Sequence, residues 1–241
     1  MNAKKLDTDR FYGMLSRLDL FPNQGMRLNE LAEQKCLPRR GVYFFREPGE
    51  FYSMVDKLPR IVRVGTHAVS SGSKSTLHSR LKAHLGTKTG SGNHRGSIFR
   101  LHVGNALLFK ENMGLPTWGI GSTAPLELRE NPAAQYAEAA LEKRVSQYIG
   151  EMTVLWVDVP DEPSSTSIRA IIERNSIALL SNKRSPIEPA NSTWLGQFSP
   201  REEIRTSRLW NLKHVGETYD PQFLVVLEEA IERTCSTSWP K

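Results

Sequence analysis

The stretch that decides the fold is Gly41-Val-Tyr-Phe-Phe45, followed by Arg60-Ile-Val-Arg-Val-Gly65. Both runs are rich in β-branched and aromatic residues, which favour strands. Pro38 precedes the first run and Pro59 precedes the second, and proline is tolerated at the start of a strand. The sequence therefore predicts two strands that follow one another along the chain.

Patterns around these strands predict helices and one further strand. Leu77, Leu81 and Leu85 recur every four residues, which predicts a helix with a narrow apolar stripe over 76–85. The run at 152–159 predicts a third strand. Similar patterns predict helices at 8–18, 28–35, 97–109, 132–149, after 163–166 and at 221–233, and one or two helical turns from Pro48 to Lys57.

The expected class is therefore α+β, with a small three-stranded sheet, mixed or antiparallel, flanked by helices. We expect a helical extension at 1–37, a core at 38–185 and a C-terminal tail at 186–241 that packs on the core. The segment 86–96 contains four glycines and predicts a mobile basic loop.

Charge is distributed unevenly along the chain. The 241 residues carry 32 Lys and Arg against 26 Asp and Glu, a net charge of +6. No acidic residue lies between Asp56 and Glu111, and this acid-free segment holds ten of the basic residues. Such a concentration of like charge repels itself and indicates an anionic partner. Nucleic acid is the leading expectation, with an acidic protein surface or an anionic membrane as alternatives.

Composition excludes several classes of protein. Hydrophobic residues make up 39% of the chain and the mean hydropathy is −0.43. No run approaches the roughly 18 apolar residues of a membrane span. The first ten residues have charges of both signs, which is not typical of a signal peptide. Two cysteines, Cys36 and Cys235, are too few for a disulfide framework or a four-cysteine zinc site. We expect a cytoplasmic protein that does not bind membranes.

Five elements, in order and in the expected secondary structures, resemble the GIY-YIG nuclease superfamily. The resemblance runs from 41 to 182, with an expected extension to about 229, and implies an α+β nuclease domain. Gly41-Val-Tyr43 stands at the position of the GIY element, and Arg63-Val-Gly-Thr66 stands at the position of YIG and the small polar residue after it. Arg80 and His84 match the arginine and histidine of the family's first helix. The strand at 152–159 is followed by Glu173, which matches the metal-binding glutamate, and Asn182 matches the later asparagine.

Two departures from the family pattern affect the expected chemistry. Arg63 stands where the family has its second tyrosine, so a role shared by two tyrosines is in question. The connection from the GVY run to the VGT run is longer than usual, and the stretch from His84 to the third strand is enlarged, as in restriction-type members. Arg63 could have taken over a phosphate contact, or it could be an exposed strand residue.

The resemblance implies a role for each matched residue. Glu173 would bind Mg²⁺, or Mn²⁺ in its place, since a single carboxylate suits a cation that keeps much of its water. Arg80 would hold the scissile phosphate with its forked guanidinium. Tyr43 and His84 would deprotonate water, directly or by a relay. Asn182 would fix Glu173 or a phosphate by hydrogen bonds.

One alternative to Glu173 stays open at this stage. Ala140-Leu-Glu142 also fits the pattern of two apolar residues followed by glutamate, and Glu173 is preferred because it follows the third strand directly. A surface carboxylate paired with a nearby arginine is the ordinary explanation for either. The residues expected to contact nucleic acid are Arg63, Thr66, Lys74, Lys82, Lys88, His94 and Arg95.

The sequence therefore predicts a metal-dependent endonuclease acting on double-stranded DNA. A restriction or defence enzyme is favoured over a repair incision nuclease, because no helix-hairpin-helix or second nuclease region is recognisable. The alternative from another class is a non-catalytic nucleic-acid-binding protein on the same fold. The sequence leaves open whether the substrate is DNA or RNA, which target sequence is cleaved and whether the protein forms a homodimer.

Overall fold

The computed structural model describes residues 3–34, 37–53, 57–87, 89–120, 125, 127, 130–187 and 191–239. Within these residues, β1 (Met26–Arg27), β2 (Gly41–Ser53), β3 (Leu58–Gly65) and β4 (Thr153–Asp158) form one antiparallel sheet in the order β1-β4-β2-β3. The α+β class is confirmed. The sheet has one strand more than predicted, because the two residues of β1 pair with β4 and are too short to leave a pattern in the sequence.

The described part of the connection between the first two predicted strands is not helical, so the helical turns predicted from Pro48 to Lys57 are wrong there, whereas residues 54–56 lie outside the described residues. β2 continues through Pro48 and Gly49 to Ser53, and Phe51 pairs with Pro59 on β3. The register shifts after Phe45, which lets the pairing absorb a proline and a glycine at positive φ. The enlarged connection is therefore a long β-hairpin.

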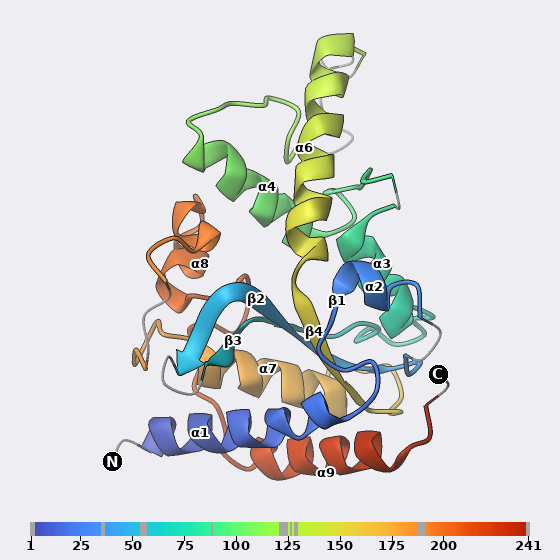
Figure 1. Ribbon diagram of the computed structural model, residues 1–241, viewed down its shortest axis with the longest axis vertical. Coiled ribbons are helices and arrows are strands. Elements are labelled where there is room, and N and C mark those ends of the chain that lie inside the picture. The colour runs from blue at the N-terminus through green and yellow to red at the C-terminus, as the bar shows by residue number, and fades with distance from the viewer. Residues whose placement is uncertain are drawn as a thin grey trace.

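Helices cover both faces of the sheet (Figure 1). Most lie where apolar periodicity predicted them, although their ends differ by a few residues. Among the described residues, no helix is long and apolar enough to cross a membrane. The helical elements are α1 (Ala3–Ser16), η1 (Leu18–Leu20), α2 (Leu28–Leu31), α3 (Leu77–Leu85), α4 (Ile98–Lys110), α6 (Pro132–Gly150), α7 (Ile168–Leu180), η2 (Leu195–Phe198), α8 (Glu202–Ser207) and α9 (Phe223–Ser236).

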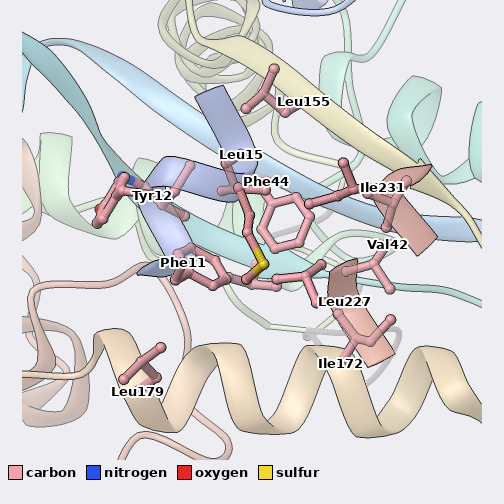
Figure 2. Packing of buried hydrophobic residues seen from close by; sticks show 14 of the residues in the cluster. Phe11, Tyr12, Leu15, Val42, Phe44, Leu155, Ile172, Leu179, Leu227 and Ile231 are labelled. Carbon is pink, nitrogen blue, oxygen red and sulfur yellow. The ribbon is translucent and has the colours of Figure 1, made fainter. Parts of the chain in front are cut away.

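Strand β2 is buried on both faces. Side chains alternate along a strand, so Val42 and Phe44 point to one side and Tyr43 and Phe45 to the other. Val42 and Phe44 pack with α1, α7 and α9, as Figure 2 shows. Tyr43 and Phe45 pack with α3, α4, α6 and the segment 194–210. One short run therefore supplies the centre of two apolar cores.

The C-terminal segment packs against the edge of the sheet. The backbone N–H of Trp210 donates to the carbonyl of Val62 at 2.7 Å, and the Asn211 amide bonds both backbone groups of Val64. These bonds occupy the outer edge of β3, which would otherwise expose unpaired backbone groups. The tail thus closes the open edge of the sheet.

A buried carboxylate joins three distant segments. Glu47 of β2 accepts hydrogen bonds from the Tyr148 hydroxyl and from the indole N–H groups of Trp194 and Trp210, at 3.0 and 3.2 Å. Burial raises the pKa of Glu47, and the three donors oppose that rise. Because its partners come from α6 and from the tail, Glu47 fixes the hairpin against both.

Replacing Glu47 with alanine should destabilise the fold strongly. Three buried donors would lose their acceptor, and one unsatisfied donor costs about 1–3 kcal/mol, so Glu47→Ala should lower the free energy of unfolding by about 3 kcal/mol or more. Urea unfolding measures the change. Glu228→Ala is the control, because Glu228 forms surface ion pairs with Arg10 and Arg17 that contribute less than about 1 kcal/mol. Equal effects of the two substitutions would contradict this role of Glu47.

Candidate active site

The first two strands bring the two motif runs together. Tyr43 of β2 lies directly opposite Gly65 of β3. A Cβ atom at Gly65 would overlap the hydroxyl and ring of Tyr43, so only glycine leaves room for this ring against the neighbouring strand. Gly65 is therefore required to leave space for Tyr43, so the second motif run accommodates the tyrosine of the first.

Tyr43 begins a chain of buried hydrogen bonds. Its hydroxyl lies 2.8 Å from Nε2 of His84, and Nδ1 of His84 lies 2.8 Å from the hydroxyl of Ser97. Burial and the nearby charges of Arg63, Arg80 and Arg100 hold the pKa of His84 well below its usual range. His84 is therefore a neutral imidazole at neutral pH.

The hydrogen bonds assign the tautomer of His84. The Tyr43 hydroxyl is fully buried, so its single proton needs a hydrogen-bond acceptor. Nε2 of His84 is that acceptor, and Nδ1 then carries the proton and donates to Ser97. A proton relay from Tyr43 to His84 is thus already aligned.

Arg63, which stands in place of the second motif tyrosine, is buried beneath the site. Its Nη1 donates to the carbonyl of Trp210 at 2.6 Å, and the guanidinium lies 4.6 Å from the centre of the Phe99 ring. Burial lowers the pKa of Arg63, while Tyr43 and Glu173 favour its charged form. Its Nε is buried without a hydrogen-bond partner among the described residues. Arg63 is therefore a core cation next to Tyr43 and not an exposed strand residue.

Glu173 reaches the same place from α7, on the other face of the sheet. Its Oε1 accepts the backbone N–H of Thr66 at 3.1 Å, and Thr66 in turn donates its hydroxyl to the carbonyl of Gly41 at 2.8 Å. Burial raises the pKa of Glu173, and Arg63, the Thr66 N–H, His214 and Arg80 act against the rise. A carboxyl group with a raised pKa beside two guanidinium groups is typical of a functional site.

Arg80 is the accessible cation of this group. It lies on α3, whose start is fixed by mutual hydrogen bonds between Thr76 and Ser79, and its side chain is half-buried. Its charge acts on Arg63, His84 and Glu173. Among the described residues, its guanidinium has no hydrogen-bond or ion-pair partner. Arg80 is therefore available to bind an anion.

Glu142, the alternative to Glu173, lies in a different environment. It forms an ion pair with Arg100 and accepts hydrogen bonds from the backbone and the Nδ1 of His94. Arg100 is fully buried and also donates to the carbonyls of His84 and Leu85 at the end of α3. Glu142 is thus already paired, and Glu173 is the carboxylate that lies with Arg63 and Arg80.

Asn182 does not join this group. It follows the end of α7, nine residues beyond Glu173, which corresponds to about 13 Å along a helix. Its side-chain oxygen accepts the N–H of Ile187 at 3.0 Å, and it lines a small pocket with Tyr12 and Arg60. The structure therefore does not support contact between Asn182 and Glu173.

The residues expected to contact nucleic acid have different surroundings. Lys74 and Lys82 are exposed, whereas Lys88 lies outside the described residues. His94 is buried, stacks on Trp118 and accepts the N–H of Gly119 on Nε2. These contacts favour a structural role for His94.

Folding brings acidic residues from other parts of the chain to the basic residues of the acid-free segment. Three of its arginines pair with carboxylates outside it: Arg60 with Glu50, Arg95 with Glu138 and Arg100 with Glu142. The glycines of its loop at 86–96 allow close packing, since a Cβ atom at Gly92 would overlap the Arg100 guanidinium. The described part of this loop therefore packs against Arg100 at Gly92.

Sequence reasoning missed two residues of the site. Ser97 completes the hydrogen-bond chain, and its position three residues before Arg100, as the N-cap of α4, was a usable signal. His214 acts on the charge of Glu173 and bonds Glu217 at 2.8 Å. It lies in the tail, and no local pattern connects it to α7. Among the described residues, no group of three or more His, Cys, Asp or Glu could hold a metal ion.

Substituting Gly65 should test the fit of Tyr43. Gly65→Ala would force the two strands or the ring apart and should destabilise the protein by about 1–3 kcal/mol. In the background of Tyr43→Leu the same substitution should cost less, because the clashing hydroxyl is gone. A double-mutant cycle by urea unfolding measures the coupling. Strictly additive effects would contradict the contact.

Comparisons with known proteins agree with this geometry. A family model described as the GIY-YIG domain matches residues 2–237, nearly the whole chain. No curated protein and no solved structure matches the chain significantly. With the motif residues assembled around one strand pair and the family model covering both layers of the fold, the chain belongs to the GIY-YIG nuclease superfamily.

Proposed function

We propose that the protein is a magnesium-dependent endonuclease that hydrolyses phosphodiester bonds of double-stranded DNA. The observation that carries this proposal is the convergence of Glu173, Arg80 and Arg63 beside Tyr43. Phosphodiester hydrolysis requires charge stabilisation at the phosphate, an acceptor for the proton of water and support for the leaving oxygen. These residues offer the corresponding groups in one place.

The donor set fits a magnesium ion. One oxygen of Glu173 is oriented by the Thr66 N–H, and the other has no donor among the described residues. Mg²⁺ commonly binds through one or two carboxylates together with waters and substrate phosphates, so a single glutamate is sufficient. When bound, the ion would neutralise the phosphate and make a coordinated water more acidic. Mn²⁺ accepts the same oxygen ligands.

Arg80 and the relay perform the remaining steps in this proposal. Arg80 binds the scissile phosphate through its unpaired guanidinium. The attacking water gives a proton to the Tyr43 oxygen as Tyr43 passes its own proton to Nε2 of His84. Neutral His84 accepts this proton at Nε2. Because the pKa of His84 is low, the imidazolium is short-lived and releases the proton to solvent. Tyr43 is buried, and water reaches it only after a small opening of the site.

We infer a restriction or defence role from the enlarged part of the fold. The stretch between α3 and β4 folds into α4 and the long α6, which extends away from the sheet (Figure 1). Such a body could contact DNA outside the cleavage site. A second copy of the chain would allow both strands to be cut.

One observation favours a second candidate function, binding without catalysis. Arg63 replaces the second motif tyrosine, and the remaining Tyr43 is fully buried. A protein that retained only the phosphate contacts would bind DNA through Arg80 and leave it intact. The cleavage assay below separates the two functions.

Cleavage should depend on Glu173 and Arg80. With Mg²⁺ and supercoiled plasmid, Glu173→Gln and Arg80→Ala should each lose at least about 100-fold in rate, as is typical when one charge-stabilising group is removed. Glu232→Gln is the matched control, since Glu232 is a largely exposed carboxylate on α9. If the wild type binds DNA but does not nick it with Mg²⁺ or Mn²⁺, the binding function replaces the proposed one.

Stability should distinguish Glu173 from Glu142. Because the pKa of Glu173 is raised in the folded state, its ionised form destabilises the fold increasingly as pH rises above the unfolded value of 4.5. Glu173→Gln should therefore not lower the melting temperature at pH 7.5. Glu142→Gln should lower it, because Arg100 would lose its partner. The reverse order would contradict the two assignments.

The pH dependence of cleavage should follow Glu173. The carboxylate must be ionised to bind the cation, so the rate should fall as pH decreases through a pKa above 4.5. Burial and nearby arginines hold the pKa of His84 well below its usual value of 6.5, so the imidazole should add no step near that value. Measurements of kcat/KM from pH 5 to 9 test this. A step near pH 6.5 that disappears in His84→Gln would show that the imidazole titrates instead.

A further inference from the structure

An open pocket lies beside Arg80, and Glu173 is not among its lining residues. Its volume is about 420 Å³, within the range of small-ligand sites. Arg80 stands at its margin, and its walls include Ile98 and Leu101 of α4 and the glycines Gly96 and Gly119. Gly119 has a φ of 82°, a conformation that favours glycine, so the turn that lines the pocket there requires this residue. The proposed mechanism does not use this pocket.

Ion pairs and stacking hold the walls in place. Arg95 bonds the carbonyls of Ile120 and Thr117 and forms an ion pair with Glu138 of α6. These contacts tie the segment at 117–120 to the helix behind it. Because the donors of Arg95 already bond these carbonyls and Glu138, Arg95 shapes the wall and is poorly placed to bind a ligand.

Aromatic packing also holds the residues around the pocket in place. Trp118 stacks on His94, with ring centres 3.9 Å apart, and donates its indole N–H to the carbonyl of Leu101. A Cβ atom at Gly104 would overlap the Trp118 ring, so α4 needs glycine at that position. The pocket is therefore preformed, and a ligand would not have to order it.

The chemistry of the pocket is amphipathic. Arg80 offers a cation without a partner among the described residues, and Ile98 presents an apolar side chain that is 45% exposed. Leu101 extends the apolar wall. A ligand that matches this combination has a phosphate joined to a flat apolar body. A nucleotide has both parts.

We infer that this pocket binds the base and sugar of the nucleotide adjoining the phosphate held by Arg80. The inference rests on the proposed function, since it takes the nucleotide to be part of the bound DNA strand. A base that enters the pocket must leave the helical stack, as in enzymes that turn a nucleotide out of the duplex. The pocket would thereby fix the position of the strand relative to Glu173 and contribute to the choice of cleavage site.

Binding of a small probe tests the pocket without requiring cleavage or a known target sequence. Thymidine 3′,5′-bisphosphate carries one base and two phosphates, and inorganic phosphate carries the anion alone. In calorimetric titrations with EDTA, the full chain should bind the bisphosphate at least tenfold more tightly than phosphate. Equal affinities would overturn the proposal.

Two matched substitutions locate the base. Ile98→Ser removes the exposed apolar wall and should reduce the preference for the bisphosphate at least threefold, with phosphate binding unchanged. Val225→Ser is the control, because Val225 is 44% exposed on α9. Melting temperatures confirm that both variants are folded. If Ile98→Ser binds the bisphosphate as the wild type does, the base lies elsewhere and the proposal fails.

Competition with DNA identifies the source of the nucleotide. In EDTA, duplex DNA should displace the bisphosphate from the wild type if the pocket lies on the path of the strand. A bisphosphate that stays bound while DNA binds would make the pocket a site for a free nucleotide and would overturn the proposal. Plasmid cleavage is independent of these measurements. A nuclease that ignores the bisphosphate refutes only the pocket, whereas bisphosphate binding without cleavage refutes only the nuclease.

Discussion

The structure depends on one strand, β2, that is buried on both faces. The alternation in Val42-Tyr-Phe-Phe45 sends side chains into two separate cores, so the helices of both layers are packed around the same short run. Because both faces of β2 are filled by apolar side chains, the charged groups of the site lie at the edge strand, β3. Arg63 approaches from the Tyr43 side of β3, and Glu173 approaches from α7 on the opposite side. The site therefore lies where the two layers meet, at the end of β3.

This location explains the unusual electrostatics. Arg63 is buried without an acidic hydrogen-bond partner among the described residues, and the carboxyl group of Glu173 has a raised pKa. A buried charge that is only partly compensated costs stability, and such strain is commonly retained at functional sites. A phosphate beside Arg80 would add negative charge near the guanidinium groups of Arg63 and Arg80. A divalent cation would add positive charge near the carboxylate of Glu173. The charges of Arg63, Arg80 and Glu173 would therefore be better compensated if the proposed phosphate and cation were bound.

Local patterns were sufficient to predict the central strands, most helices and the group of Tyr43, Arg80, His84 and Glu173. These features depend on residues close together in the sequence or on an ordered motif. The errors have a common cause, because each depends on contacts that the local pattern does not contain. The arginines of the acid-free segment meet Glu50, Glu138 and Glu142, which all lie outside it. Asn182 faces Ile187 because α7 carries it past the end of the site.

The basic residues divide into two groups once folding pairs them. Arg100 uses its guanidinium to hold the carbonyls of His84 and Leu85, and so fixes the last turn of α3 against α6. Arg80 lies one turn before His84 on the same helix, where its charge has no protein partner among the described residues. The paired arginine therefore orients the helix from which the unpaired one projects. Charge count alone could not separate these roles, since only the acidic partner supplied by α6 decides which arginine remains available to an anion.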